Sequence, residues 1–147
     1  MTFFPEIDIE RSKTNAKRKL REYQRWRRIA GDVGEQKITA TYSFEPKQKY
    51  GSPSKVVERL AINRLTAESE VEAIRWAVSH LLEPNHRRIL IEKYLSNSYK
   101  EDTAIYTDLS ISESFYYELL EGALLAFAEL YRNGSLLVEK CGVLAEF

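Results

Sequence analysis

The chain has 147 residues, a formal net charge of zero and a hydrophobic fraction of 44%. This length suits one domain, or a small domain with an extended arm, and allows a buried core. A single cysteine excludes a disulfide framework and fits a reducing cytoplasm. No stretch approaches the roughly 18 apolar residues of a membrane helix, and the start does not read as a signal peptide. We therefore expect a cytoplasmic protein that has no membrane partner.

The charge is distributed unevenly along the chain. Residues 1–28 contain nine Lys or Arg and four Asp or Glu, whereas residues 101–147 contain two and nine. The N-terminal segment is therefore basic and the C-terminal segment acidic. This asymmetry says more about partners than the balanced total does, because local charge decides what a surface attracts.

The first predicted element is a basic helix over residues 14–30. Apolar residues recur at helical spacing along it, and basic residues crowd the remaining faces. Ser12 or Thr14 is expected to cap its start. Gly31 and Gly34 are expected to end it, since glycine is common just beyond a helix.

The middle of the chain carries a weaker pattern. Alternation over residues 37–44 predicts a short strand or extended segment. Residues 45–54 contain prolines and a glycine and predict a linker. We therefore divide the chain into a basic helical arm and linker over residues 1–50 and a helical domain over residues 51–147.

Further helices are predicted through the second half of the chain. One starts at Pro53 and runs to about residue 65, and a second, capped by Thr66, covers residues 67–82. A third covers residues 86–95 after Pro84-Asn85. The last two are expected over residues 101–109 and from Glu113 to about Arg132, so that the fold class is mainly α.

The two C-terminal helices predict a helix-turn-helix at about residues 101–127. Such a motif joins two short helices at a steep angle around a shared core. Ala104 is expected to face the second helix, and Ile105 is expected to lie in the core. The apolar side chain of Ile111 is expected to pack inside the turn, and Ser112 is expected to cap the second helix. The same pattern also fits a helical hairpin in an ordinary bundle.

A DNA-binding role would place particular side chains on the nucleic acid. The second helix of a helix-turn-helix enters the major groove, where polar and aromatic side chains meet base edges and phosphates. Lysine and arginine supply the affinity for phosphates. The candidate DNA-binding residues are Ser112, Ser114, Phe115 and Tyr117 in the motif, Arg87, Arg88 and Lys100 beside it, and Arg18, Lys19, Arg25 and Arg28 in the first helix.

Several segments together resemble the ArpU family of phage transcriptional regulators. They are "FPEIDIERSKTNAKRKLREYQRWR", "ITATYSF", "LLEPNHRRILIEKYL", "AIYTDLSISESFYYE" and "LLAFAELYRNGSLLVEK". Residues 86–127 are also similar to region four of bacterial sigma factors. The resemblance implies a sigma-region-four-like fold that binds double-stranded DNA. It also implies control of phage or prophage late genes with host RNA polymerase, in the cytoplasm of the bacterial host.

One feature departs from the family pattern. Glu118 and Glu121 follow the paired tyrosines of the second helix, where family members tend to carry a basic residue. An acidic face opposes phosphate contacts. Two alternatives therefore stay open, a protein-interaction module without DNA binding and a small DNA-packaging subunit of the terminase type. The opposite charges of the two ends also predict a homo-oligomer.

No pattern of catalytic or metal-binding residues is found. His80, His86 and Cys141 do not have the close ligand spacing of a zinc site. The scattered glycines form no phosphate-binding loop. We therefore expect neither an enzyme nor a bound metal or cofactor.

Overall fold

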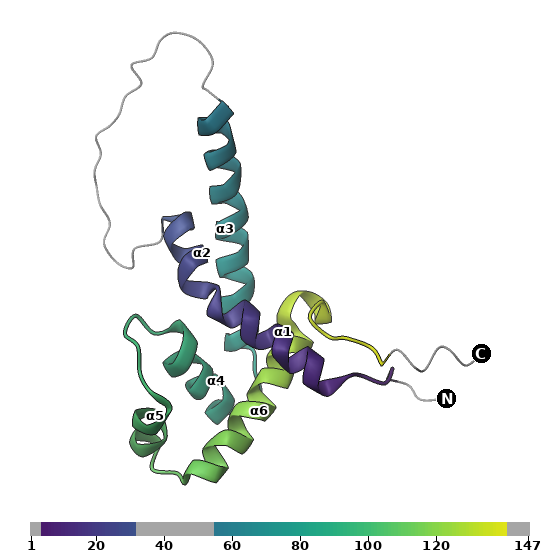
Figure 1. Cartoon of the computed structure of the whole chain (residues 1–147), viewed down its shortest axis with the longest axis vertical. Helices are drawn as coiled ribbons and strands as arrows, with labels where there is room; N and C mark the ends of the chain where they lie inside the picture. Colours follow the sequence, from purple (N-terminus) through teal and green to yellow (C-terminus); the bar gives the residue numbers. More distant parts are fainter. Residues whose placement is uncertain (1–3, 32–54, 141–147) are drawn as a thin grey trace, which may run out of the picture.

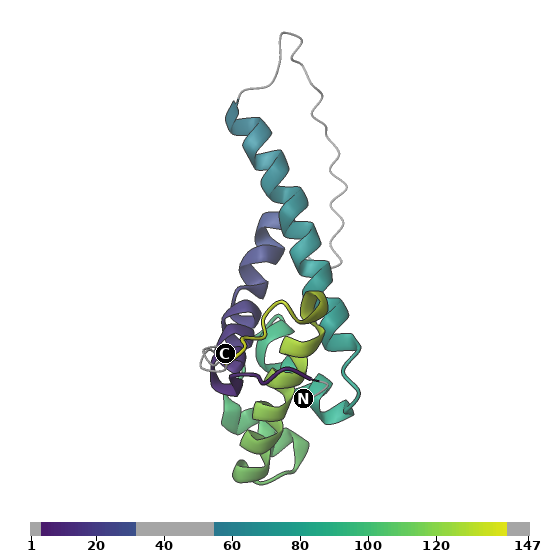
Figure 2. The same cartoon turned by 90° about the vertical axis from the view of Figure 1, so that its right-hand side faces the viewer.

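The protein is mainly helical, as the sequence predicted. The computed structural model describes residues 4–31 and 55–140, where every regular element is a helix except for one isolated β-bridge. The longest helix, α3 (Lys55–Ser79), follows the long axis of the molecule, and the other helices gather around its C-terminal half (Figures 1 and 2). Gly34, the predicted strand at 37–44, the linker at 45–54 and the division at residue 50 lie outside the described residues.

The basic segment forms two helices, which corrects the single helix predicted over residues 14–30. α1 (Ile9–Arg21) and α2 (Tyr23–Ala30) are separated at Glu22. The N-cap is Asp8, whose carboxylate accepts from the Arg11 backbone amide at 3.1 Å, so the prediction of Ser12 or Thr14 was wrong. Gly31 ends α2 with φ of 79°, which confirms its predicted role.

α3 corrects the prediction of two helices that meet at Thr66. One continuous helix runs through this position, and Thr66 is exposed within it. Neither glycine nor proline interrupts Lys55–Ser79, and a threonine in a helix interior costs only a fraction of a kcal/mol, roughly 0.7 or less. The capping preference of threonine therefore did not stop the helix.

The third predicted helix, over residues 86–95, starts earlier and changes geometry halfway. α4 (Pro84–Leu90) has proline at its first position, and the Glu83 carboxylate accepts from the Asn85 amide at 3.2 Å, so Glu83 is the cap. The chain then continues as a π-helix, η1 (Ile91–Leu95).

The last two helices closely match the prediction. α5 covers Asp102–Leu109 and α6 covers Glu113–Leu130. A 3-10 turn, η2 (Tyr131–Gly134), follows α6, so the final helix ends slightly before Arg132. Arg132, Asn133 and Gly134 all have positive φ, which ends the regular helix in this place.

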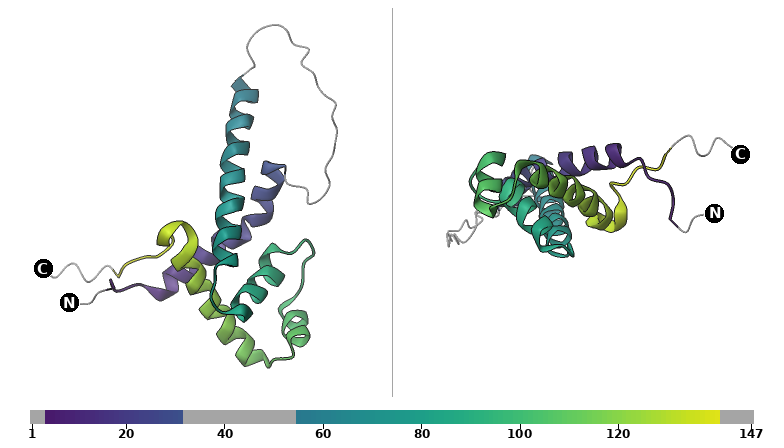
Figure 3. Two further views of the ribbon diagram at one scale, coloured as in Figure 1. Left: turned by 180° about the vertical axis from the view of Figure 1, so that it is seen from behind. Right: turned by 90° about the horizontal axis from the view of Figure 1, so that it is seen from below.

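A single cluster of buried side chains joins all of the α-helices. α1 and α2 supply Ala16, Leu20, Tyr23 and Ala30. Among the described residues, α6 supplies the largest share of the buried side chains. Figure 3 shows α1 crossing α6, and both helices pack closely together. Burying one side chain such as Leu20 stabilises the fold by roughly 1.5–3 kcal/mol. The basic helices α1 and α2 thus share one core with the acidic C-terminal helices α5 and α6.

The two ends of the described chain pair beside α1. The Asp8 amide donates to the Val138 carbonyl at 2.7 Å, and the Lys140 amide donates to the Glu6 carbonyl at 3.2 Å. The buried Ser12 hydroxyl accepts from the Val138 amide at 2.9 Å. This pairing holds α1 in place over α6.

Candidate nucleic-acid interface

The chain makes a tight turn between α5 and α6. Ser110 ends α5 with φ of 59°, a left-handed conformation that is unusual for a residue with a Cβ. The Ile111 amide then donates to the Tyr106 carbonyl at 3.1 Å. The Ser112 side chain accepts from the Phe115 amide at 3.1 Å, which confirms its predicted role as the N-cap of α6. These contacts fix where α6 begins.

The side chains that fill the space between α5 and α6 differ in part from the prediction. Ile105 and Tyr116 are fully buried, and Ile111 packs against the core. Ala104 is exposed, so the expectation that it faces α6 was wrong. Because adjacent positions on a helix are about 100° apart, burying Ile105 turns Ala104 toward solvent.

The first turns of α6 present the predicted contact residues to solvent. Ser112 and Ser114 are exposed, and Phe115 and Tyr117 are 44% and 38% exposed. The structure thus brings these four together on one end of α6. Glu113 and Glu118 are exposed on the same turns, so the surface combines hydroxyl and aromatic groups with negative charge.

Behind this surface, Asp102 is a centre of hydrogen bonds. Its Oδ1 atom accepts from the Tyr116 hydroxyl at 2.6 Å and from Lys93 Nζ at 2.6 Å. Its Oδ2 atom accepts from the Tyr117 hydroxyl at 3.3 Å. Asp102 is the first residue of α5, where a negative charge is also favoured by the helix dipole. One carboxylate therefore ties η1, α5 and α6 together.

The hydrogen bonds and the partial burial shift the pKa values of both Asp102 and Tyr116. Partial burial by itself raises the pKa of Asp102, but the hydrogen bonds from Lys93 and Tyr116 outweigh it and hold the pKa below its usual value. Burial and the bond to the carboxylate raise the pKa of Tyr116. Asp102 therefore stays charged and Tyr116 stays protonated at neutral pH.

The basic residues near α5 and α6 are largely paired. Lys100 Nζ lies 2.7 Å from Glu92 and 3.2 Å from Asp108. Arg88 Nε lies 3.8 Å from the other oxygen of Glu92. Arg87 donates to the Leu81 carbonyl, which holds it against the end of α3. Lys100 and Arg87 thus act first as internal contacts, and Arg88 remains more than half exposed.

Lys19 is directed into the protein rather than into solvent. Its Nζ atom lies 3.4 Å from both Glu22 and Glu70, and 5.5 Å from the centre of the Tyr131 ring. Burial lowers the pKa of Lys19, but Tyr131 and the two carboxylates raise it by more, so the group stays charged. The structure therefore separates Lys19 from the other predicted arm residues.

The other basic candidates of the arm lie together on a solvent-exposed face. Arg18, Arg25 and Arg28 are all exposed, and Arg18 and Arg25 line one shallow hollow that also includes Arg21. These residues lie on α1 and α2, whereas Ser114 and Phe115 lie at the start of α6. The predicted residues thus form two separate groups.

Sequence reasoning did not identify Asp102 as the residue that joins these helices, nor its bond to Lys93. The signal available for Asp102 was an acidic residue at the expected start of a helix, combined with a tyrosine on the inner face of the next one. Tyr94 packs against the core, and burial raises the pKa of its hydroxyl to about 12.

The described residues contain no group of three or more His, Cys, Asp or Glu side chains arranged to hold a metal ion. Among the described helices, none combines the length and apolar character that a membrane span requires. Cys141 lies outside the described residues.

Comparison with known proteins places the chain in a family. It is 48% identical over 136 residues to a protein of Streptococcus phage O1205 whose provisional name is autolysin regulatory protein ArpU. The match covers 92% of this chain and 98% of the relative. The chain belongs to the ArpU family. No family model and no solved structure matches it.

The aligned region includes both groups of predicted contact residues, those on α1 and α2 and those at the start of α6. Because the match extends over nearly the full length of both proteins, α1 and α2 belong to the ArpU-family protein as much as α5 and α6 do. The resemblance that the sequence segments indicated is confirmed at the level of the family.

Proposed function

We propose that this ArpU-family protein is a phage transcriptional regulator that binds double-stranded DNA through α5, the turn at 110–112 and α6. The observation that carries the proposal is the exposed N-terminal end of α6, which follows a tight turn and carries Ser114, Phe115 and Tyr117. Helix-turn-helix proteins place this part of their second helix in the major groove. The name of the relative, a phage regulatory protein, supports the same class of function.

Each exposed side chain suits a particular contact. The Ser114 hydroxyl can bond a phosphate or a base edge, and the Phe115 ring can contact a thymine methyl group. The Tyr117 hydroxyl donates to Asp102, which orients its ring at the surface. Ser112 is occupied as the N-cap, so its contribution is to hold the helix end in place.

The proposal extends to the mode of regulation. The similarity of residues 86–127 to sigma region four favours host RNA polymerase as a second partner. On this account the protein is a regulator without catalytic activity, and it acts in the bacterial host cytoplasm, where phage DNA is transcribed.

A second candidate is a protein-interaction module that does not bind DNA. Glu113 and Glu118 are exposed beside the proposed contacts, and Lys93 and Lys100 are paired with carboxylates. This end of the molecule would therefore repel a phosphate backbone unless positive charge is supplied from another surface.

The test measures binding of the full chain to duplex fragments from the surrounding phage or prophage genome, against unrelated duplexes. We expect selective binding, and the double variant Ser114→Ala and Phe115→Ala should lower the preference by about tenfold or more, because one contact to a base is worth roughly 1–3 kcal/mol. Leu82→Ala is the matched control, since Leu82 is 95% exposed on the turn after α3.

Two outcomes would contradict the proposal. One is the absence of any sequence preference in the wild-type protein at low salt, which would favour the protein-interaction module. The other is a preference that survives the double variant unchanged, which would place recognition elsewhere.

A further inference from the structure

We infer that the phosphate backbone of DNA is bound by a ridge of arginines on α1 and α2, rather than by the unit formed by α5 and α6. The arginine ridge consists of Arg11, Arg18, Arg21, Arg25 and Arg28. This inference rests on the proposed DNA binding. It assigns the electrostatic part of that binding to a surface far along the chain from the proposed base contacts.

The arginines of the ridge are regularly spaced. They are separated by seven, three, four and three residues, which keeps Arg11, Arg18 and Arg21 on one side of α1 and Arg25 and Arg28 on one side of α2. All five are exposed, and the buried positions Ala16, Leu20 and Tyr23 lie between them in sequence, on the opposite face. The fold therefore sorts the arm into an apolar inner face and an arginine outer face.

The arginines of the ridge also differ from the lysines of the same helices in how their charges are paired. Among the described residues, no carboxylate lies within ion-pair distance of Arg18, Arg21, Arg25 or Arg28, and Arg11 has only a distant contact to Asp8 at 3.9 Å. The same helices direct Lys13 to Glu121 and Lys19 to Glu70. The arm thus pairs Lys13 and Lys19 with carboxylates, whereas within the described residues Arg18, Arg21, Arg25 and Arg28 form no ion pair.

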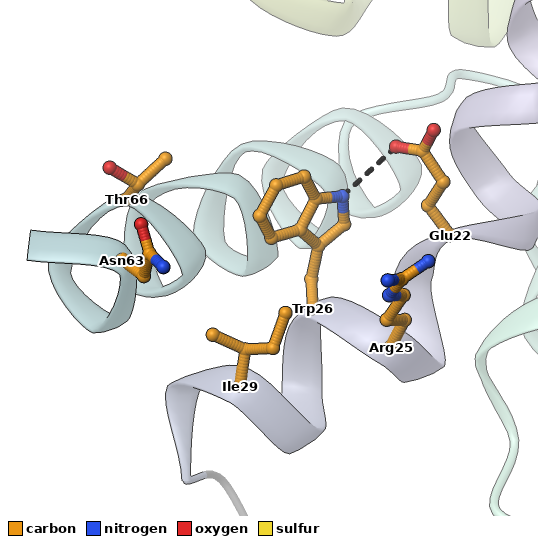
Figure 4. A pocket seen from close by; sticks show the side chains of 6 residues that line it. All are labelled: Glu22, Arg25, Trp26, Ile29, Asn63 and Thr66. Carbon is orange, nitrogen blue, oxygen red and sulfur yellow. Dashed lines mark hydrogen bonds between the residues drawn. The ribbon is translucent and has the colours of Figure 1, made fainter. Parts of the chain in front are cut away.

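Among the described residues that line the hollow between these arginines, Glu22 is the carboxylate, and it is already engaged. Glu22 accepts from the Trp26 indole at 3.0 Å and lies 3.4 Å from Lys19 Nζ. Figure 4 shows this hydrogen bond between Trp26 and Glu22, and it shows Arg25 on α2, the helix that also carries Trp26. Glu22 is thus paired with Lys19, and within the described residues it forms no ion pair with an arginine of the ridge.

The cations beside α5 and α6 differ from those of the ridge. Lys93, Lys100 and Arg88 are paired with Asp102, Glu92 or Asp108, and the outer face of α6 is acidic. DNA affinity comes largely from cations that displace counterions at phosphates. The arginine ridge gathers several such cations on one surface, and arginine is well suited to phosphate because it binds in a planar, bidentate way.

The dimensions also fit a duplex. At about 1.5 Å per residue, the arm from Arg11 to Arg28 would span roughly 25 Å if it were straight. This corresponds to about seven base pairs of axial length on one strand at 3.4 Å each. The break at Glu22 changes the direction of the ridge between Arg21 and Arg25, so that it can follow a curved groove edge.

The test is a salt series of binding to a random-sequence 30-base-pair duplex (roughly three helical turns) and to the preferred genomic fragment. The ridge variant carries Arg18→Gln, Arg21→Gln and Arg25→Gln. The control carries Lys55→Gln, Arg59→Gln and Lys140→Gln, which removes the same charge from other exposed positions. A third protein with lysine at the three ridge positions keeps the charge.

We expect the ridge variant to lose affinity for both duplexes and to reduce the slope of log K against log salt by about 3, because each lost phosphate contact reduces it by about 1. Its preference for the genomic fragment should persist. The lysine protein should retain the slope, and the control should match the wild type. Thermal melting monitored by circular dichroism checks that all four proteins fold.

The outcomes separate the two ideas. An unchanged slope in the ridge variant, or an equal loss in the control, overturns the ridge while leaving selective binding intact. Salt-dependent binding that needs the ridge but lacks any sequence preference supports the ridge and contradicts the proposed function. Tighter binding to single-stranded RNA than to duplex DNA also overturns the inference, as does no binding to either duplex at low salt.

Discussion

The Tyr116 hydroxyl donates to the Asp102 carboxylate across 2.6 Å, from the first turns of α6 to the first residue of α5. Tyr116 is fully buried, and the neighbouring Tyr117 is exposed and donates to the same carboxylate. The pair of tyrosines therefore has divided roles. Tyr116 fixes the angle between the two helices, and Tyr117 belongs to the surface that we propose to contact DNA.

The first prediction concerns Tyr116→Phe. Removing the hydroxyl keeps the ring in the core but leaves the partly buried Asp102 with one donor fewer, which should cost about 1–2 kcal/mol of unfolding free energy. A urea titration followed by circular dichroism measures this cost. Tyr106→Phe is the control, because Tyr106 contacts the Tyr116 ring but its hydroxyl makes no bond to Asp102. Equal stability of Tyr116→Phe and the wild type would contradict the assigned role.

The second prediction concerns the pH dependence of stability. The pKa of Asp102 is lowered in the folded protein, so its contribution is complete above the unfolded value of about 3.9 and is lost as the pH falls through the folded value. Asp102→Asn should therefore lower the unfolding free energy at neutral pH. Below about pH 3.9, the unfolding free energies of the variant and the wild type should become more similar. Chemical denaturation at a series of pH values measures this. A constant difference between the two proteins at every pH would contradict the prediction.

The third prediction compares two neighbours in sequence. Lys19→Gln should lower the unfolding free energy by about 1 kcal/mol or more, because Glu70 loses a partner at a mostly buried position. Arg18→Gln should change it by less than about 0.5 kcal/mol, as is usual for an exposed residue, because Arg18 forms no ion pair within the part of the chain that the structure describes. DNA affinity should show the reverse order once it is compared among folded proteins. An equal effect of both substitutions on stability would show that Lys19 is not held inside.

Much of the fold follows from local signals. Ser112 and Gly31 were identified as helix ends because capping depends on the adjacent residues alone. The cap of α1 was predicted at Ser12 or Thr14, but the helix begins earlier and Asp8 caps it. The Ser12 hydroxyl instead accepts from the amide of Val138, which lies 126 residues away. Similarly, the basic spacing of the arm showed a charged helix but not which cations point inward. That distinction is made by Glu70 and Tyr131, whose position beside Lys19 depends on the tertiary fold.

The fourth prediction tests the continuity of α3. Glu68 would lie in the first turn of a second helix capped by Thr66, where proline is tolerated. In the continuous helix, Glu68→Pro removes an interior hydrogen bond and should cost about 3 kcal/mol or more. Glu68→Ala is the control and should have a small effect, since Glu68 is 53% exposed. Similar melting temperatures for the two variants would contradict a single helix.

The most direct test of the proposed function is photo-crosslinking from position 115. A photoreactive phenylalanine analogue that replaces Phe115 preserves the size and shape of an exposed aromatic side chain. With the preferred genomic duplex bound, we predict a covalent product between position 115 and bases of the recognised sequence, and none from the same analogue at position 82. A protein that binds this duplex yet forms no crosslink from position 115 would contradict the claim that α6 meets the DNA.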